Sequence, residues 1–254
     1  MLDKELIKKN FSKYARYYDR HASVQNLCAL KLIERIKAGG FGKILDVGCG
    51  TGNYTGLLKE RFPMAKIKAM DISGEMIEIA KEKLNDNSIE FIIADGETTN
   101  FEERFDLIGS NAVFQWFENL EITLSGYKDS LNEKGVISFS IFGPLTFNEL
   151  DGSLKELYGD EAAISSRGFA EKETIEKILK GLFRKIEVEQ KIYKERYASL
   201  LKLLKKIKYT GTRGNGLNKN FWTAGKADKT EKIYKKKYKD IIATYQVFFC
   251  KGVK

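Results

Sequence analysis

The chain has 254 residues, 43% of them hydrophobic, and a formal net charge of +9. This apolar content is enough to bury a full core in one large domain or in a domain with an insertion. No apolar run reaches the ~18 residues that a membrane span needs, and the charged N-terminus lacks the apolar segment of a secretory signal, so we expect a cytoplasmic protein.

The predicted elements begin with a mostly helical segment at residues 3–38. Apolar runs and helical patterns then alternate along the chain, which indicates strands at 43–48, 66–71, 89–95, 105–110 and 135–143 and helices at 53–61, 74–84 and 118–131. This alternation predicts an α/β fold with a doubly wound, mostly parallel sheet and right-handed crossovers.

The second half of the chain adds a helix at 171–181 and two strands at 183–193 and 243–253, which bring the expected sheet to seven strands. The residues between these last two strands form an insertion, which we expect to be helical. The predicted organisation is a single domain over 1–254, composed of a helical N-terminal cover (1–40), a core (41–193), a helical lid insertion (194–239) and a final strand (240–254).

Charge is distributed unevenly along the chain. Residues 170–254 hold 23 Lys and Arg against 9 Asp and Glu, whereas residues 1–169 hold 21 against 26. A strongly basic half should attract an acidic partner, and nucleic acid, an anionic membrane and an acidic carrier protein are all candidates from charge alone. No RRM or KH signature accompanies the charge, so nucleic acid is not favoured.

Cysteine and histidine are scarce. Cys28, Cys49 and Cys250 are far apart and odd in number, so they form neither a disulfide framework nor a metal site. His21 is the only histidine, which argues against a multi-histidine metal site. A serine–histidine–acid triad would need this one residue, and no nucleophile-elbow pattern accompanies it. We therefore expect no metal.

The glycine-rich stretch "ILDVGCGTGNYTG", residues 44–56, lies between a predicted strand and a predicted helix, at the edge where open α/β sheets bind ligands. Gly48, Gly50 and Gly52 follow a G-x-G-x-G spacing, which departs from the G-x-G-x-x-G spacing of dinucleotide sites. Asp46 lies at the leading edge of this loop. Its carboxylate would repel a pyrophosphate but suits a cationic ligand.

Two further acids end the next two predicted strands. Asp71 can accept hydrogen bonds from both hydroxyls of a ribose, and Asp95 is followed by Gly96. Acids at three successive strand ends, without a phosphate-binding lysine, indicate a site for a nucleoside that carries positive charge.

These features resemble the class I S-adenosylmethionine-dependent methyltransferases over residues 40–143, in the segments "LDVGCGTG", "MDIS" with Met76, "ADGETTNF" and "FDLIGSNAVFQWF". The resemblance implies S-adenosylmethionine as cofactor, with Asp46 near its amino-acid end and the three glycines beneath it. It further implies that Asp71 binds the ribose, Ile72 or Met76 packs on the adenine and Asp95 accepts from the adenine amino group. The resemblance completes the cofactor contacts with three more residues, Tyr14, Gly96 and Asn111. A glycine turn in another doubly wound fold remains the alternative.

The flanking segments resemble the malonyl-acyl-carrier-protein O-methyltransferases of biotin synthesis along nearly the whole chain. The similar segments are "FSKYARYYDRHASVQ" (11–25), "SNAVFQWF" (110–117), "FGPLTFNEL" (142–150), "SRGF" (166–169) and "ATYQVFF" (243–249). The loop "GTRGNG" (211–216) departs from the glycine–alanine–threonine pattern of that family. The resemblance implies that the acceptor is the free carboxylate of a malonyl group on an acidic carrier protein, docked on the basic half.

A carboxylate acceptor is already deprotonated near neutrality and needs no general base, which agrees with a chain that has one histidine. We expect Arg167 to hold this carboxylate through its planar fork, with a surface charge as the alternative. Tyr18 is expected at the methionine end or the acceptor, or else in simple packing. Gln115 and Trp116 are expected at the mouth of the methyl channel. His21 is expected to be structural.

Three rival functions remain open. The first is a small-molecule carboxyl methyltransferase of the trans-aconitate type, which has a similar "SN-A--QW" segment. The second is a tRNA or rRNA methyltransferase, and the third is a regulator that binds S-adenosylmethionine without catalysis. The lysine run at 232–240 fits either a solvated helix face or a docking patch for the carrier protein.

Overall fold

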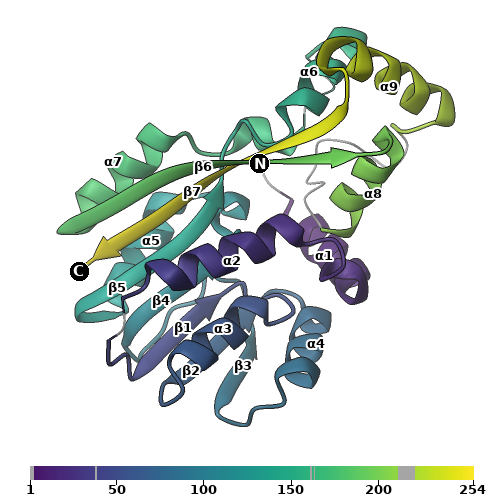
Figure 1. The fold of residues 1–254 in the computed structure, drawn as a ribbon. Coiled ribbons are helices and arrows are strands. Elements are labelled where there is room, and N and C mark those ends of the chain that lie inside the picture. Colours follow the sequence, from purple (N-terminus) through teal and green to yellow (C-terminus); the bar gives the residue numbers. More distant parts are fainter. Residues whose placement is uncertain (1–2, 38, 161, 163, 211–220) are drawn as a thin grey trace.

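The computed structural model describes residues 3–37, 39–160, 162, 164–210 and 221–254. They form a seven-stranded sheet in the order β3-β2-β1-β4-β5-β7-β6 (Figure 1). The strands are β1 (Lys43–Val47), β2 (Lys66–Asp71), β3 (Ile89–Ile93), β4 (Phe105–Asn111), β5 (Leu131–Phe142), β6 (Lys185–Tyr197) and β7 (Ile241–Val253). The first five strands are parallel, and β7 runs antiparallel to both β5 and β6. The expected α/β, mostly parallel, seven-stranded sheet is confirmed.

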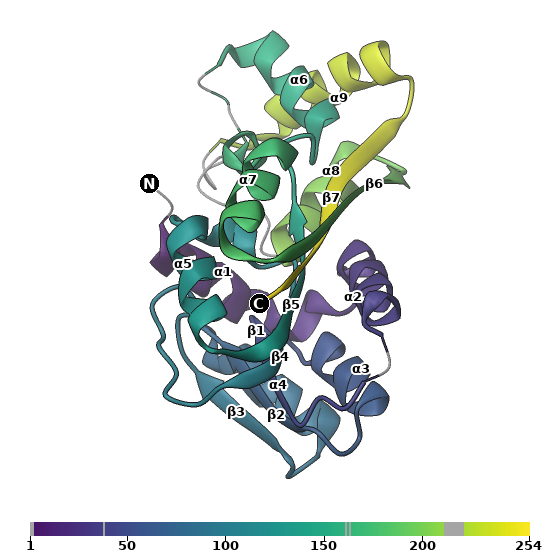
Figure 2. The ribbon, with the colours of Figure 1, turned by 90° about the vertical axis from the view of Figure 1, so that its left-hand side faces the viewer.

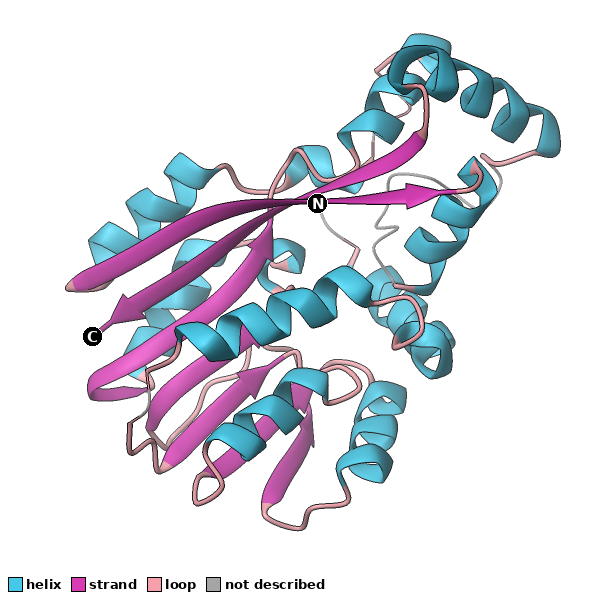
Figure 3. Cartoon of the chain, viewed as in Figure 1, coloured by secondary structure: helices cyan, strands magenta, loops and turns pink. Residues whose placement is uncertain are grey.

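Helices cover both faces of the sheet (Figure 3). Their bounds are α1 (Lys4–Tyr18), α2 (Ser23–Arg35), α3 (Asn53–Arg61), α4 (Gly74–Leu84), α5 (Leu120–Asp129), α6 (Asn148–Tyr158), α7 (Lys172–Leu182), α8 (Leu200–Tyr209) and α9 (Ala224–Tyr238), with short 3-10 turns η1 (Phe114–Trp116) and η2 (Ser165–Gly168). One core lies under α2, α3 and α4, and the other lies under α5 and α7. Successive residues of a strand point to opposite faces of the sheet and so pack into different cores, as Ile44 and Leu45 do in β1. None of the described helices is long and apolar enough to cross a membrane.

The strand order reverses at β1. The chain runs outward from β1 to β2 and β3, then returns to the other side of β1 with β4. Such a reversal leaves a crevice beyond the carboxyl ends of β1 and β4, because the flanking connections leave the sheet in opposite directions there. The glycine-rich loop enters this crevice directly after β1.

The β6–β7 pair forms a ribbon that extends past the rest of the sheet (Figure 2). Phe142, the last paired residue of β5, lies opposite Val247, whereas β6 and β7 stay paired as far as Tyr197 and Ile241. This overhanging end carries α8 and α9. There α8 packs against α1, and α9 packs against α6.

Most element boundaries follow the sequence predictions, and several match to the residue, including α3, β2 and α4. Two differences concern the second half. Strand β6 continues to Tyr197, so the insertion begins later than residue 194, and neither α6 nor the 3-10 turn η2 that follows it was predicted. The "GTRGNG" loop at 211–216 lies outside the described residues.

Candidate active site

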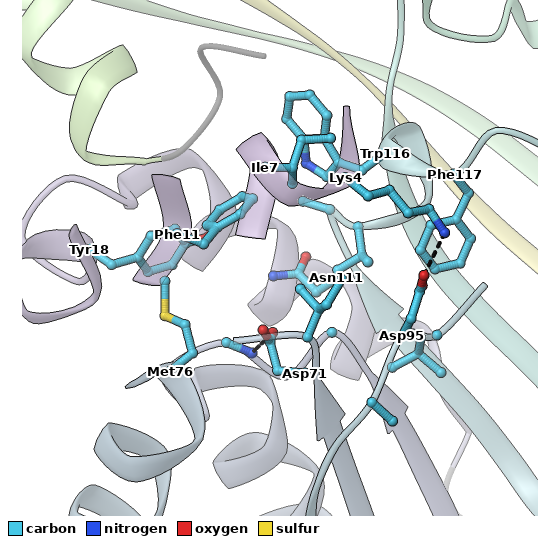
Figure 4. Close-up of a pocket in the computed structure, with 18 residues that line it drawn as sticks. Lys4, Ile7, Phe11, Tyr18, Asp71, Met76, Asp95, Asn111, Trp116 and Phe117 are labelled. Carbon is cyan, nitrogen blue, oxygen red and sulfur yellow. Dashed lines mark hydrogen bonds and ion pairs between the residues drawn. The ribbon is translucent and has the colours of Figure 1, made fainter. Parts of the chain in front are cut away.

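A pocket with about 750 Å³ of empty space, part of it open to solvent, lies in this crevice beneath α1 (Figure 4). Most of the residues predicted from the sequence line it. These are Tyr18, Gly48, Gly50, Asp71, Ile72, Met76, Asp95, Gly96, Asn111 and Trp116. Elements far apart in the chain therefore bring the predicted residues together at one edge of the sheet.

The glycine-rich loop turns through left-handed backbone. Gly48 has φ +70° and Gly50 has φ +54°, conformations that disfavour residues with a side chain. No atom lies within 4 Å of the place where a Cβ of Gly50 would stand, whereas a Cβ on Gly48 would lie 2.3 Å from Val113. Gly50 thus leaves its backbone open to a ligand, and Gly48 allows the segment after β4 to approach closely.

Asp71 ends β2 and anchors this loop. Its Oδ2 accepts a hydrogen bond from the backbone N–H of Gly50 at 2.9 Å, and its Oδ1 accepts one from the N–H of Ser73 at 2.9 Å. Burial raises the pKa of Asp71, although these backbone hydrogen bonds oppose the shift. Because each carboxylate oxygen has a second lone pair, Asp71 can still accept two hydroxyls.

Asp95 lies on the other side of the pocket and pairs with the N-terminal helix. Lys4 Nζ donates to Asp95 Oδ2 at 2.7 Å and lies 2.6 Å from Glu97 Oε2, as the dashed line to Asp95 in Figure 4 marks. Asp95 Oδ1 accepts from the N–H of Glu97. This lysine connects the first turn of α1 to the carboxyl end of the sheet.

Helix α1 covers the pocket with one face. Lys4, Ile7, Phe11 and Tyr18 all line the pocket, and they lie within one stripe of the helix because their spacing follows its period. The helix is held down at its middle by a hydrogen bond between the hydroxyls of Ser12 and Ser73 at 2.9 Å.

Tyr18 ends α1 inside the site. Burial, followed by the nearby carboxylates Asp71 and Asp19, raises the pKa of its phenol, so the hydroxyl stays neutral and can donate a hydrogen bond at neutral pH.

The segment after β4 forms the remaining wall. Asn111 donates from Nδ2 to the carbonyl of Gln25 at 3.0 Å and accepts from Ser140 Oγ at 2.8 Å. Trp116 stands edge-to-face between Phe11 of α1 and Phe169, with ring centroids 6.4 Å and 5.5 Å away. Phe169 also lines a smaller, mostly apolar cavity with about 450 Å³ of empty space.

Residues 45–139 match the methyltransferase domain family. Over 94% of this chain and 90% of its own length, malonyl-[acyl-carrier protein] O-methyltransferase 1 of Ilyobacter polytropus is 37% identical to this protein. The chain belongs to the malonyl-[acyl-carrier protein] O-methyltransferase family. The Bacillus cereus member of the family is 31% identical over 98% of this chain and 97% of its own. Among solved structures, the YcgJ protein from Bacillus subtilis shares the fold with a TM-score of 0.64 at 13% identity, over 90% of this chain and 98% of its own.

Asp46, by contrast, does not line the pocket of this family member. It shares a strand face with Ile44, so its side chain points into the core below α3, where Oδ2 accepts from Thr55 Oγ1 at 2.6 Å. Burial raises the pKa of Asp46 to about 7, against the lowering effect of Thr55, and the charge of Asp71 adds to the rise. The side chain of Asp46 therefore lies beneath the glycine-rich loop, bonded to Thr55 of α3, and not in the pocket where the cofactor contact was predicted.

Three other predicted residues also lie outside the lining. Tyr14 turns toward α8, where its ring meets Tyr209 at 5.3 Å. Gly52 caps α3 with φ +83°, and a Cβ there would lie 3.1 Å from Ala80 of α4, so it serves helix packing. Gln115 donates to the carbonyl of Ala112 at 2.6 Å and accepts from the N–H of Phe142, which leaves its amide engaged with backbone.

Arg167 lies outside both cavities. Its Nε lies 2.7–2.8 Å from the two carboxylate oxygens of Asp151, and its Nη1 lies 3.4 Å from Asp160. Its Nη2 is buried, and no described residue accepts a hydrogen bond from it. Arg167 is therefore a partly exposed, ion-paired residue that keeps one buried donor unused among the described residues.

The sequence analysis missed several residues that line the pocket, among them Lys4, Ile7, Phe11, Val113 and Phe117. The three on α1 carry a signal, because their spacing of three and four residues marks one helical face. Once Tyr18 was assigned to the site, this periodicity could have identified them.

Proposed function

We propose that this protein transfers a methyl group from S-adenosylmethionine to the free carboxylate of a malonyl group on acyl carrier protein. The similarity along nearly the whole chain to proteins that bear this name carries the proposal. As the resemblance in sequence implies, the methyl ester would start pimeloyl synthesis for biotin. Because both substrates are metabolites of the cytoplasm, we place the activity there.

The pocket suits the proposed cofactor. Asp71 has lone pairs left for two ribose hydroxyls, Asp95 has one for the adenine amino group, and Gly50 leaves open backbone between them. The carboxylates also favour a ligand with positive charge. When bound, S-adenosylmethionine would supply an electrophilic methyl group on a cationic sulfur.

The chain itself would contribute positioning and exclusion of water. A malonyl carboxylate is a nucleophile without loss of a proton, so the site needs no base and must only align one oxygen with the methyl carbon and its sulfur. As that oxygen forms its bond to the methyl carbon, the carbon–sulfur bond breaks and its electron pair stays on sulfur. The cover of α1 and the Trp116 wall would keep this reaction away from solvent.

Arg167 is proposed to hold the acceptor carboxylate through Nη2. Its other donors face Asp151 and Asp160, which would fix the plane of the guanidinium and aim the unused donor. Tyr18, which lines the pocket, would contribute a neutral hydroxyl. Holding one edge of the carboxylate leaves the other oxygen free to attack.

One experiment separates this function from its rivals. The protein is incubated with methyl-labelled S-adenosylmethionine and, in parallel, with malonyl carrier protein, malonyl-CoA, trans-aconitate or bulk tRNA. We expect label on the malonyl thioester, released as methanol by mild base because an ester is formed. Label on trans-aconitate or tRNA alone would overturn the proposal. The variant Asp71→Asn, in which cofactor binding should be impaired, is the negative control for labelling.

A further inference from the structure

A third cavity, a hollow with about 900 Å³ of space that opens to solvent, lies where the α1–α2 turn, the end of β6 and α8 meet. Five basic side chains line it against a single acid. The basic residues are Arg20, Arg196, Lys202, Lys205 and Lys206, and the acid is Glu195. No part of the mechanism above uses this hollow.

Most of this charge is not neutralised. Lys206 pairs with Glu195, and Arg196 lies 3.2 Å from Asp240. Within the described part of the chain, Arg20, Lys202 and Lys205 have no carboxylate within ion-pair distance. Three cations from two different elements therefore face one concave surface without a counter-charge.

The floor of the hollow is a fixed structure. Lys206 is only 6% exposed, and its ammonium lies over the ring of Tyr245 at 5.4 Å while it bonds to Ser23 and Glu195. Ser23 also donates to Glu195. These contacts join the start of α2, strand β6 and α8, so the basic side chains project from a rigid base.

His21 also lines the hollow, and the positive charges of the hollow act on its ring. Its ring stacks on Tyr209 with centroids 4.8 Å apart. Partial burial and then the positive charges of Lys205, Lys206 and Arg20 lower its pKa. As the only histidine in the chain, it reports on this hollow alone.

The hollow adjoins the candidate active site. Tyr18 lines the pocket, and Arg20 and His21 line the hollow only two and three residues later. Two residues span at most about 7 Å, so an anion bound here lies close to the covered pocket. Glu195 and Tyr197 belong to the overhanging end of β6, past the last residue that β5 pairs with β7.

We propose that this basic hollow docks the carrier protein, with the phosphodiester of its phosphopantetheine arm and the adjoining acidic surface facing Arg20, Lys202 and Lys205. The choice of partner rests on the proposed function. Arginine and lysine together are suited to a phosphate, and a concave basic surface concentrates an acidic protein by electrostatic attraction.

This placement differs from the lysine run at 232–240. In α9, Lys235 pairs with Glu231 at 2.6 Å and Lys237 pairs with Glu156 at 3.1 Å, and the helix packs against α6. Lys232 and Lys236 are exposed there without such pairs among the described residues. They provide a control of the same charge on another helix, four residues apart where Lys202 and Lys205 are three apart.

The first test measures binding without turnover. The ring resonances of His21 are titrated by NMR in the full-length protein, with and without holo carrier protein and with apo carrier protein that lacks the arm. We expect the holo form to raise the pKa of His21 toward its ordinary value, because a bound phosphate offsets the nearby cations. An equal effect of the apo form, no effect of the holo form, or a rise with tRNA alone would overturn the proposal.

The second test measures methyl transfer. The double variant Lys202→Gln, Lys205→Gln is expected to raise the KM for malonyl carrier protein about 5- to 10-fold and to weaken its dependence on salt. The same variant should use malonyl-pantetheine, which has no phosphate, as well as the wild type does. The control Lys232→Gln, Lys236→Gln should leave both substrates unaffected. Equal loss in both double variants would overturn the site, whereas a wild-type protein inactive on every malonyl thioester would overturn the proposed function instead.

Discussion

Lys4 Nζ lies 2.7 Å from Asp95 Oδ2 and so joins the first turn of the covering helix to the acid proposed to bind adenine. Asp95 keeps lone pairs for a ligand, so the lysine stabilises the cover without blocking the site. Both partners are partly buried, with 22% and 26% of their side chains exposed.

Lys4→Met should loosen this cover. The ion pair is partly screened, so we expect S-adenosylhomocysteine to dissociate about 3- to 5-fold faster, which corresponds to the upper range for exposed pairs. Stopped-flow displacement measures the rate. Lys9→Met, on the exposed side of α1, is the control and should dissociate as the wild type does. Unchanged or slower dissociation from the Lys4 variant would show that the pair does not retain the cofactor.

Asp71→Asn should weaken cofactor binding. The amide keeps one acceptor oxygen but loses the charge and one hydroxyl partner, so we expect about 10- to 100-fold lower affinity for S-adenosylhomocysteine by calorimetry. Glu82→Gln, an exposed change on α4, controls for net charge. Thermal unfolding without ligand checks that the glycine loop survives the change. Wild-type affinity in a folded variant would retire the ribose assignment.

Arg167→Lys tests the acceptor role with the positive charge retained. The ammonium cannot reproduce the fork, so we expect the KM for malonyl-pantetheine to rise about 10-fold or more while affinity for S-adenosylhomocysteine stays within about 2-fold. Arg184→Lys, at an exposed site, should change neither. Parallel loss of cofactor affinity would assign Arg167 to stability of the site instead of to the acceptor.

Tyr18→Phe tests the phenol. Because the pKa of Tyr18 is raised by burial and by Asp71, the hydroxyl acts as a neutral donor, and we expect about a 10-fold loss of kcat with a flat pH profile between about pH 6 and 9 in both proteins. Tyr14→Phe on the same helix faces Tyr209 and should keep full activity. A wild-type rate that rises with one deprotonation in this range would indicate a general base and contradict the mechanism.

Asp46→Asn should change the pH dependence of stability. The folded-state pKa of Asp46 is about 7, above the value of about 4 in an unfolded chain, so the folded protein binds the proton more tightly and wild-type stability falls as pH rises from about 4 to 7. The amide cannot ionise. Relative to the wild type, the variant should gain roughly 2 kcal/mol of unfolding free energy at pH 8 compared with pH 5, measured in urea.

A cost of the amide that does not depend on pH cancels in this comparison. Asp129→Asn, at an exposed carboxylate, should show the same difference from the wild type at both pH values. A parallel pH profile for Asp46→Asn would mean that the buried carboxyl group is not protonated in the folded protein.

The cofactor half of the fold could be predicted because its signals are local. The ends of strands such as β2 and of capped helices such as α4 are marked by a few local residues. Ser73, for example, caps α4 by accepting a hydrogen bond from the N–H of Met76. Asp71 and Asp95 then follow from strand ends that must meet at one edge of a parallel sheet.

Other assignments depend on distant parts of the chain. The direction of Tyr14 depends on α8, whose Tyr209 is far away in sequence, and the partners of Arg167 depend on the unpredicted helix α6, which supplies Asp151. For Asp46 a local rule was available, because the alternation of β1 places it with Ile44 on the core face.

The overhanging ribbon separates the segment that carries α8 and α9 from the strands that lead to the cofactor-binding residues. Helices α8 and α9 are both attached through the free ends of β6 and β7, past the last residue that β5 pairs. Segments fitted between those ends can be exchanged without disturbing the strands that hold Asp71 and Asp95. A chimera that takes this segment from a relative with another acceptor should therefore inherit the new specificity and keep its affinity for the methyl donor, provided that the contact between α8 and α1 is retained.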